Sequence, residues 1–174
     1  NEEKKYNIYQ MTYDEVKTFD VGLKPHPRFP QQQKIKAVKP LLSDVFTAIK
    51  NEMMIRKRPF PYFNIETKST AQTDNIFHPE PAEFVELLMA VINEFDLREQ
   101  VTIQSFDIRT LQYLHKKYPL VKTALLIESY DRRSINLQLE QLGFTPTIYS
   151  PSYNLVTAEL IHHCHETFHI RTHF

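Results

Sequence analysis

Apolar residues recur with a helical period after Pro79 and Pro81, and this is the clearest pattern in the chain. The apolar side chains there fall three and four positions apart, at Phe84, Leu87, Leu88, Val91, Ile92 and Phe95. Proline is favoured in the first turn of a helix, and this spacing places the apolar side chains on one face. The pattern therefore predicts an amphipathic helix that begins near Pro81.

Short β-rich runs alternate with helical patterns from residue 62 onward. The predicted strands cover residues 62–66, 101–104, 123–127 and 147–149, with one more beginning at 168–171. The predicted helices between them cover residues 81–95, 107–118, 134–142 and 157–166, and Gly143 follows the third of these as its C-cap. Strict alternation with continuous apolar strands predicts a parallel sheet covered by helices. A doubly wound sheet and a (β/α)8 barrel both fit, but a complete barrel usually needs about 250 residues.

The region before residue 62 is less regular. Thr12 and Glu15 have the spacing of a capping box, which predicts a short helix over residues 12–20. Four prolines then break any helical or strand pattern, so residues 21–42 are predicted to form a long surface loop within one domain over residues 1–174. Ser43 is expected to cap an amphipathic helix that runs to about Glu52.

Composition excludes several classes of protein. The 174 residues are 41% hydrophobic and 24% charged, which is typical of a globular domain with a real core rather than of a disordered or fibrous chain. The 21 basic and 21 acidic residues give zero net charge, so no long-range field favours nucleic acid as a partner. No apolar stretch is long enough to predict a membrane span. With only 2 glycines, a glycine-rich phosphate loop is also excluded.

The compartment stays open. Cys164 is the single cysteine and has no partner for an internal disulfide, so the fold needs no oxidising environment. The polar start of the sequence does not resemble a signal peptide, and the absence of an initial Met indicates trimming or excision. Cytoplasmic location and export after signal removal both fit.

Candidate chemistry lies where the predicted strands end, because active sites of parallel α/β folds lie at the carboxyl ends of their strands. The polar residues there are Glu66, Lys68, Ser105, Asp107 and Glu128. Glu66 ends an otherwise apolar strand, and together with Lys68 it is suited to hold a divalent cation and an anionic oxygen. The alternative is a simple ion pair. Asp107 is interpreted as a helix N-cap, and Glu128 as a solvated carboxylate.

The histidines suggest a second chemistry. Five of the 8 histidines lie in the last thirteen residues, and His165, Glu166 and His169 match H-E-x-x-H, a zinc-binding helix motif. That motif requires a helix through His169 and a third ligand, whereas the pattern over residues 168–172 favours a strand. A zinc hydrolase is therefore an alternative. His162, His163 and His165 fit polar positions on an exposed helix face.

Several segments together resemble the glycerophosphodiester phosphodiesterases, a barrel family. Residues 63–69, Phe-Asn-Ile-Glu-Thr-Lys-Ser, resemble the family's N-I-E-x-K strand, and residues 104–107, Gln-Ser-Phe-Asp, resemble its S-F-D strand end. Further similar segments follow in the family's order at residues 11–22, 39–46, 149–151 and 155–160. The resemblance covers nearly the whole chain.

This resemblance implies a TIM barrel and a metal-dependent hydrolase of lipid metabolism. Such an enzyme converts a small-molecule phosphodiester into an alcohol and glycerol 3-phosphate, with carboxylates holding calcium or magnesium and two histidines moving protons. Glu66 takes the position of a metal ligand, and Lys68 takes that of the phosphate-facing lysine. Ser105, Phe106 and Asp107 take positions of structural support. A non-catalytic relative that only binds an anion is a further alternative.

The departures from the family pattern are equally informative. In the family, the H-R-G and P-E-N-T segment, the E-x-D metal pair and the H-D motif precede the matched region, and the W-T-V-N strand end follows it. This chain has no counterpart of these segments. His26 and His78 match neither catalytic motif. We therefore expect an incomplete barrel, roughly strands three to seven of eight, with no catalytic residue of its own and no measurable hydrolysis alone. Two unpaired sheet edges in such a half barrel favour a homo-oligomer.

Overall fold

The structure is a computed structural model that describes residues 6–173, and it divides into two compact units. One unit is Asn1–Phe60 and the other is Pro61–Phe174. The expectation of one domain over residues 1–174 stays a prediction. Within the described residues, no helix is long and apolar enough to cross a bilayer.

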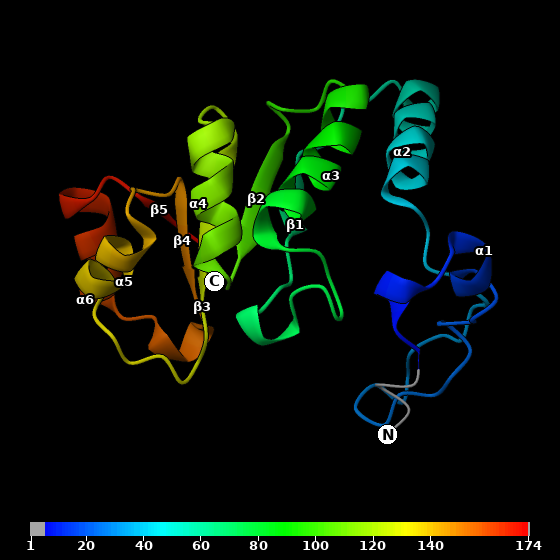
Figure 1. Ribbon diagram of the computed structural model, residues 1–174, viewed down its shortest axis with the longest axis horizontal. Helices are drawn as coiled ribbons and strands as arrows, with labels where there is room; N and C mark the ends of the chain where they lie inside the picture. Colours follow the sequence, from blue (N-terminus) through cyan, green and yellow to red (C-terminus); the bar gives the residue numbers. More distant parts are fainter. Residues whose placement is uncertain (1–5, 174) are drawn as a thin grey trace. The chain divides into compact units, whose positions relative to one another are not determined.

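The first unit contains a short 3-10 helix, η2 (Ile8–Gln10), and two α-helices, α1 (Tyr13–Val16) and α2 (Leu42–Arg56) (Figure 1). The predicted capping box is confirmed: the backbone N–H of Glu15 donates to Thr12 Oγ1 at 3.3 Å, and the N–H of Thr12 donates to Glu15 Oε2 at 2.8 Å. The helix nevertheless ends at Val16, well before residue 20. Neither helix nor strand occurs over residues 18–41.

The prediction that Ser43 caps the next helix is wrong. Helix α2 begins at Leu42, one residue earlier, and its N-cap, Leu41, makes no side-chain hydrogen bond. Leu41 follows Pro40 in an extended conformation, and Asp44 in the first turn places a negative charge near the positive end of the helix dipole. Favourable charge near the helix start therefore takes the place of a side-chain cap.

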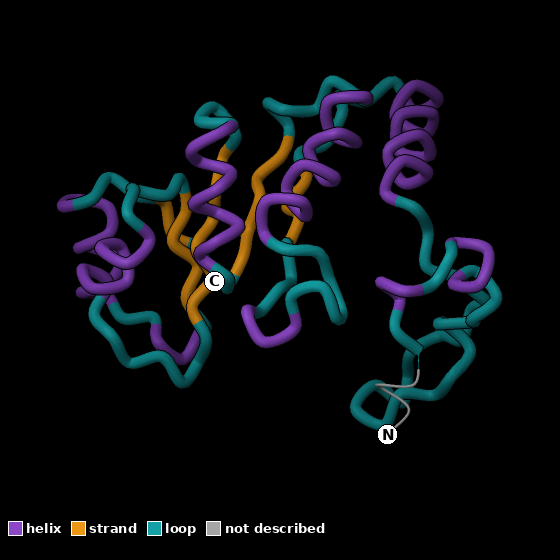
Figure 2. Tube along the Cα trace, in the orientation of Figure 1, coloured by secondary structure: helices purple, strands orange, loops and turns teal. Residues whose placement is uncertain are grey.

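The second unit is a parallel five-stranded sheet covered by helices (Figures 1 and 2). Its strands are β1 (Phe63–Glu66), β2 (Val101–Ser105), β3 (Lys122–Ile127), β4 (Ile148–Pro151) and β5 (Arg171–Thr172). Its main helices are α3 (Pro81–Glu94), α4 (Ile108–Lys117), α5 (Ile135–Leu142) and α6 (Ala158–His162), with 3-10 turns η3 (Ala71–Thr73) and η4 (Tyr153–Leu155). The predicted alternation is confirmed, and boundaries differ by a few residues.

Strand order and helix placement decide between the two folds that the sequence left open. The strands pair in chain order, β1-β2-β3-β4-β5, with every neighbouring pair parallel. Thr67, just after β1, and alternate residues of β2 and β3, among them Ile103 and Leu125, are buried on the helix-covered face. A doubly wound sheet reverses its order at a switch point and carries helices on both faces, whereas a (β/α)8 barrel does neither. The second unit is therefore part of a (β/α)8 barrel.

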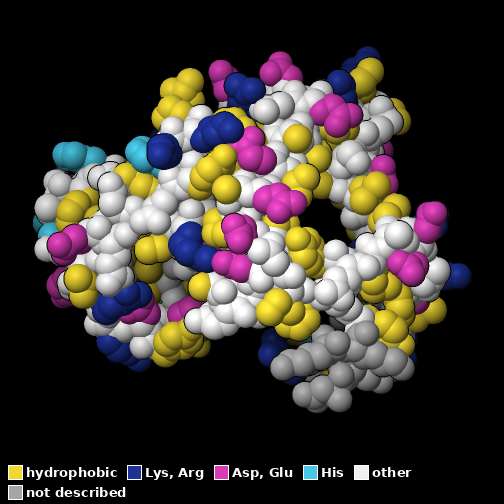
Figure 3. All heavy atoms as spheres, in the orientation of Figure 1, with side chains coloured by type: hydrophobic (Ala, Val, Ile, Leu, Met, Phe, Trp, Pro, Cys, Tyr) yellow, Lys and Arg dark blue, Asp and Glu magenta, His cyan; other side chains and the backbone are white. Residues whose placement is uncertain are grey.

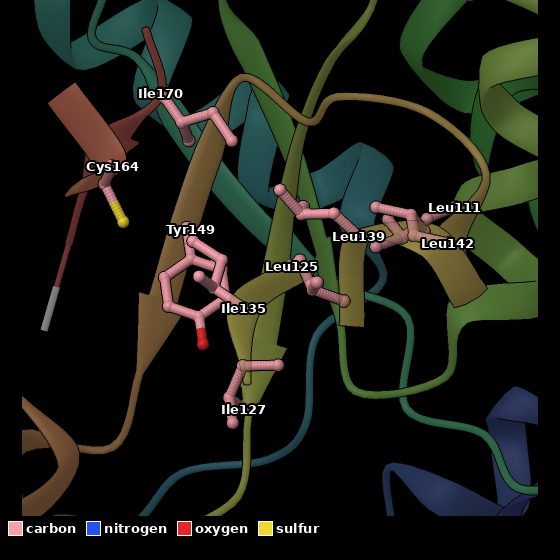
Figure 4. Close-up of a cluster of buried hydrophobic side chains, with 9 residues drawn as sticks. All are labelled: Leu111, Leu125, Ile127, Ile135, Leu139, Leu142, Tyr149, Cys164 and Ile170. Atoms are coloured by element: carbon pink, nitrogen blue, oxygen red, sulfur yellow. The ribbon is translucent and has the colours of Figure 1, made fainter. Parts of the chain in front are cut away.

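The core of the second unit lies between the covered face and the helices. Figure 4 shows nine of its side chains, from α4, β3, α5, β4 and the C-terminal segment: Leu111, Leu125, Ile127, Ile135, Leu139, Leu142, Tyr149, Cys164 and Ile170. All nine are at most 9% exposed. Their burial holds the strand ends in place, because removing this apolar surface from water is the main stabilising contribution to such a layer.

The C-terminal segment differs from its prediction. Helix α6 continues into a π-helical turn, η5 (His163–Thr167), so the predicted helix through Glu166 is confirmed. The strand is limited to β5 (Arg171–Thr172) and does not begin at Phe168 as predicted. His169 has a left-handed backbone with φ 54°, and the N–H of Ile170 donates to the carbonyl of Cys164 at 3.0 Å. This turn returns Ile170 to the core beside Cys164.

Replacing His169 with glycine is expected to stabilise the protein by about 0.5–1 kcal/mol, because glycine adopts a positive φ without steric strain. The free energy of unfolding in urea measures the effect. His165→Gly is the matched control: His165 lies in the right-handed turn, where glycine is expected to destabilise by about 1 kcal/mol. Equal effects at the two positions would contradict this explanation.

Among the described residues, β1 pairs only with β2 and β5 only with β4, so each has one edge without a partner strand. Such edges offer unpaired N–H and C=O groups to another chain. The expectation of a homo-oligomer stays a prediction.

Candidate functional site

Glu66 and Lys68 lie at the carboxyl end of β1, on the face of the sheet opposite to the helices. Side chains alternate along this segment: Thr67 is fully buried and its Oγ1 lies 2.8 Å from Thr110 Oγ1 of α4, while Glu66 and Lys68 are exposed. Successive residues of a strand point to opposite faces. Glu66 and Lys68 therefore share the open face, which becomes the interior of a closed barrel.

The structure does not support the simple ion pair as an explanation for these two residues. Neither a salt bridge nor a hydrogen bond joins Glu66 to Lys68, and neither side chain has another such partner within residues 6–173. Both charges remain available to a ligand. Their roles as metal ligand and phosphate contact stay predictions.

The strand register extends the open face from Glu66 to the opposite edge of the sheet. Glu66 pairs with Gln104, Gln104 with Ala124, Ala124 with Ile148, and Ile148 with Arg171. Paired residues of neighbouring parallel strands lie on the same face. The row therefore has a carboxylate at one end and a guanidinium at the other, with the amide of Gln104 and the apolar side chains of Ala124 and Ile148 between them.

A buried hydrogen-bond network holds the ends of β1 and β2 together. Ser105 Oγ donates to the carbonyl of Thr67 at 2.6 Å and accepts from the N–H of Asp107 at 3.0 Å. Thr110 Oγ1 donates to the carbonyl of Asp107 at 3.0 Å. Because Thr67 lies between Glu66 and Lys68, this network fixes the backbone that carries both candidate side chains. The structural role inferred for Ser105 follows from these contacts.

Asp107 is the centre of this support, and its predicted role as an N-cap is confirmed. Its Oδ1 accepts from the backbone N–H of Arg109 at 3.1 Å, and its Oδ2 accepts from Ser69 Oγ at 2.9 Å. The Arg109 guanidinium donates to Asp107 Oδ2 at 2.6 Å and to Asp74 Oδ2 at 2.6 Å. One arginine thus joins the loop after β1 to the start of α4.

The charges in this network shift one another's pKa values. Burial alone would raise the pKa of Asp107, but hydrogen bonds from Arg109, Ser69 and a backbone N–H outweigh it and hold that pKa below its ordinary value. Hydrogen bonds from Arg109 likewise lower the pKa of Asp74. The two carboxylates, Asp107 first, raise the pKa of the Arg109 guanidinium. All three groups are therefore charged at neutral pH.

His78 is a structural residue of the same loop. Its Nε2 lies 3.1 Å from the N–H of Thr70, which donates to it, and its Nδ1 lies 2.8 Å from the carbonyl of Pro79. We assign the proton to Nδ1, since Nε2 has to accept from a backbone donor. Both ring nitrogens are thus engaged, and the residue is 9% exposed. His78 is not positioned to transfer protons to a substrate.

The zinc alternative is contradicted by the backbone. His169 lies in a left-handed turn beyond the helical segment, so it does not follow His165 on one helix face as H-E-x-x-H requires. His165 Nε2 instead lies 3.2 Å from Thr172 Oγ1. Within residues 6–173, no three His, Cys, Asp or Glu side chains are grouped so as to hold a metal ion. The match in the sequence does not correspond to a site in the structure.

The same finding limits the number of ligands that the described residues provide for calcium or magnesium. These cations prefer carboxylate oxygens, and Glu66 is an accessible, unpaired carboxylate at the correct edge of the sheet, so it fits as one ligand. Among the described residues, Glu66 does not belong to any group of three His, Cys, Asp or Glu side chains that could hold a metal ion. Glu66 alone therefore does not make a closed site.

Sequence reasoning missed the partners that hold the site in place. Asp74 and Arg109 are 35 residues apart, and Thr67 and Thr110 are 43 apart, so no local spacing connects them. One signal was present: Asp107 and Arg109 form an Asp-x-Arg pair, repeated by Asp131 and Arg133, whose Nε donates to Asp131 Oδ1 at 2.9 Å. The repeat marks the start of α4 and the loop before α5.

Residues 3–165 match the model of the glycerophosphoryl diester phosphodiesterase family. The chain belongs to this family. The resemblance inferred from N-I-E-x-K and S-F-D is therefore confirmed. No curated protein matches the chain significantly.

Solved structures with the same fold include three proteins described as glycerophosphodiester phosphodiesterases. The protein from Silicibacter pomeroyi has a TM-score of 0.75 and 24% identity over 94% of this chain and 56% of its own. Those from Galdieria sulphuraria and Parabacteroides distasonis have TM-scores of 0.66 and 0.63 and identities of 17% and 16%, and they match 94% and 95% of this chain. The chain spans 56% to 58% of the length of these three proteins. At these identities the comparison shows a shared fold.

Proposed function

We propose that this chain forms the central part of a metal-dependent phosphodiesterase that hydrolyses glycerophosphodiesters to an alcohol and glycerol 3-phosphate. Family membership supports the reaction class. The observation that carries the proposal is the pair of unpaired, opposite charges at Glu66 and Lys68, exposed on the open face at the carboxyl end of β1.

In this proposal Glu66 supplies one carboxylate oxygen to a divalent cation, calcium or magnesium. When bound, such a cation neutralises the phosphate and the charge that develops on it during hydrolysis. The Lys68 ammonium, which has three donors, binds a phosphate oxygen and fixes the orientation of the diester. Thr67, between them, is tied to Ser105, so the two side chains keep their mutual position while substrate binds.

The remaining ligands and the groups that move protons are proposed to lie outside the described residues. The chain alone is therefore expected to hydrolyse glycerophosphocholine in calcium at less than about 1% of the rate of a longer form that carries flanking sequence of the same gene at both ends. Release of glycerol 3-phosphate, measured with and without a chelator, tests this.

Hydrolysis by the longer form that is abolished by the chelator supports the proposal. Robust turnover by the chain alone would contradict the inferred division of the site. A longer form that binds the diester without hydrolysing it would instead identify a non-catalytic, anion-binding relative.

A further inference from the structure

A cleft of about 770 Å³ opens at the carboxyl ends of β2 and β3, between the first turn of α4 and the helix α5. Its lining includes Ser69 after β1, Phe106 after β2, Glu128 and Tyr130 after β3, and Gln138 of α5. All strands are parallel, so this cleft and the pair Glu66 and Lys68 both lie at the carboxyl ends of the strands. Neither of these residues lines it.

The charged side chains of the cleft balance one another. Three are acidic (Asp107, Glu128, Asp131) and three are basic (Arg109, Arg132, Arg133), so the net charge of the lining is zero. Four of these six are joined in pairs, Asp107 with Arg109 and Asp131 with Arg133, at 2.6 Å and 2.5 Å. Figure 3 shows basic and acidic side chains intermixed over this view rather than gathered by sign. The lining therefore favours neither an anion nor a cation.

The cleft also contains one buried donor without an acceptor. Gln138 is 3% exposed, and its Oε1 accepts from the Tyr149 hydroxyl at 2.6 Å. Its Nε2 makes no hydrogen bond to any of the described residues. The Arg133 guanidinium and, to a smaller extent, the Gln138 amide lower the pKa of Asp131, so this carboxylate lies near Nε2 without completing a hydrogen bond to it. A buried N–H left unpaired is unfavourable, so a ligand oxygen is expected to reach it.

Glu128 supplies the complementary acceptor. Its carboxylate is half-buried and makes no salt bridge or side-chain hydrogen bond within the part of the chain that the structure describes. A hydroxyl group both donates and accepts, so neighbouring hydroxyls of one molecule satisfy Glu128 and Gln138 at the same time.

Two aromatic rings complete the lining. Phe106 is 43% exposed and Tyr130 is 77% exposed, although large apolar surface is normally buried. Aromatic side chains offer a flat apolar surface with a polar edge, which suits the C–H face of a hydroxylated ring. A charge-balanced cleft with a buried unpaired donor, an unpaired carboxylate and two exposed rings thus has the features of a site for a neutral polyol.

We infer that this cleft binds a polyol and that Gln138, Glu128 and Tyr130 are its specificity-determining residues. Its identification as the site for the headgroup of the diester rests on the proposed function. The preferred substrates are then glycerophosphodiesters with a hydroxylated headgroup, such as inositol, rather than a quaternary ammonium headgroup.

The test uses free myo-inositol and free choline as probes with the chain itself, followed by NMR chemical-shift titration. Inositol is expected to bind with millimolar affinity and to shift the resonances of residues that line the cleft, whereas choline produces no saturable shift. Glu128→Ala and Tyr130→Ala are each expected to weaken inositol binding about fivefold, because each removes one favourable contact.

Tyr153→Ala is the matched control. Tyr153 is 83% exposed on the loop after β4 but does not line the cleft, so its replacement is expected to leave inositol binding unchanged. Gln138→Leu removes the buried donor, and Glu128→Ala and Tyr130→Ala keep the test decisive if that core substitution unfolds the protein. Equal binding of choline and inositol, or unchanged affinity in both Glu128→Ala and Tyr130→Ala, would overturn the inference.

Failure of the inference is distinguishable from failure of the proposed function. Free inositol carries no phosphate, so Glu66→Gln is expected to leave its binding unchanged. Inositol binding by the chain, together with no hydrolysis of glycerophosphoinositol by the longer form, keeps the cleft assignment and rejects the proposed function. Hydrolysis by the longer form without inositol binding rejects the cleft assignment alone.

Discussion

The Glu66→Gln variant of the longer form is expected to lower kcat/KM for glycerophosphocholine by about a hundredfold or more. Glutamine keeps the size and one acceptor oxygen of the side chain but removes the charge that a hard divalent cation requires. Release of glycerol 3-phosphate over a range of calcium concentrations measures the change. If the lost group is a metal ligand, as proposed, raising the calcium concentration is expected to restore part of the activity.

Lys68→Met distinguishes the role proposed for Lys68, binding phosphate, from the role proposed for Glu66, binding the cation. It is expected to lower kcat/KM by about tenfold to a hundredfold without changing the calcium dependence, because it removes the proposed phosphate contact and leaves the carboxylate of Glu66 intact. Glu83→Gln, at an exposed carboxylate in the first turn of α3, is the control and is expected to leave activity unchanged. A calcium dependence that Glu66→Gln does not alter would show that Glu66 is not a ligand.

Replacing Asp107 with alanine is expected to lower the free energy of unfolding by about 3 kcal/mol. The side chain is 8% exposed and carries the N-cap of α4, the contact with Ser69 and half of the Arg109 pairing. Alanine leaves the Ser69 hydroxyl and part of the guanidinium without their acceptor, in a region with little access to water. Urea unfolding followed by circular dichroism measures the effect.

Asp131→Ala is the matched control, since Asp131 forms the same Asp-x-Arg pair with Arg133. Arg133 is 48% exposed and Asp131 caps no helix, so this variant is expected to lose only about 1 kcal/mol. Equal losses in Asp107→Ala and Asp131→Ala would mean that the network around Asp107 has no special structural importance.

The same carboxyl predicts how stability depends on pH. The pKa of Asp107 is lower in the folded protein than in the unfolded chain, so the stabilisation by its charge is fully present above about pH 4 and is lost as pH falls through the folded value. The difference in stability between the native protein and Asp107→Asn is therefore expected to narrow between pH 5 and pH 2.5. A difference that stays constant over this range would contradict the depressed pKa.

Residues that stabilise the structure thus alternate with candidate binding residues at the end of β1. Thr67 and Ser69 face α4 and are hydrogen-bonded to Thr110 and Asp107, while Lys68 between them faces the open side. Alternation along an extended chain makes one face structural and the other available. A rigid strand end of this kind keeps a binding side chain in position while the ligand binds.

Much of the fold was predictable from local pattern. The apolar spacing after Pro81 predicted α3, and the capping box predicted the start of α1. Gly143 predicted the end of α5, and its φ in the structure is 80°. These features depend on residues within one or two turns of each other, where backbone sterics and hydrogen bonding act directly. The strand predicted from Phe168 was wrong, because the left-handed His169 and the burial of Ile170 depend on contacts with a distant core rather than on local preference.

The candidate site was likewise predictable only where it depends on local sequence. The sequence alone determined that Glu66 and Lys68 end an apolar strand, that strands and helices alternate, and that Asp107 begins a helix, because strand period and helix capping are local properties. Only the tertiary structure decided that Arg109 joins Asp74 to Asp107, that His169 does not join His165, and that Glu128, Tyr130 and Gln138 share one cleft. Those contacts join residues far apart in the chain, and burial of the common core brings them together.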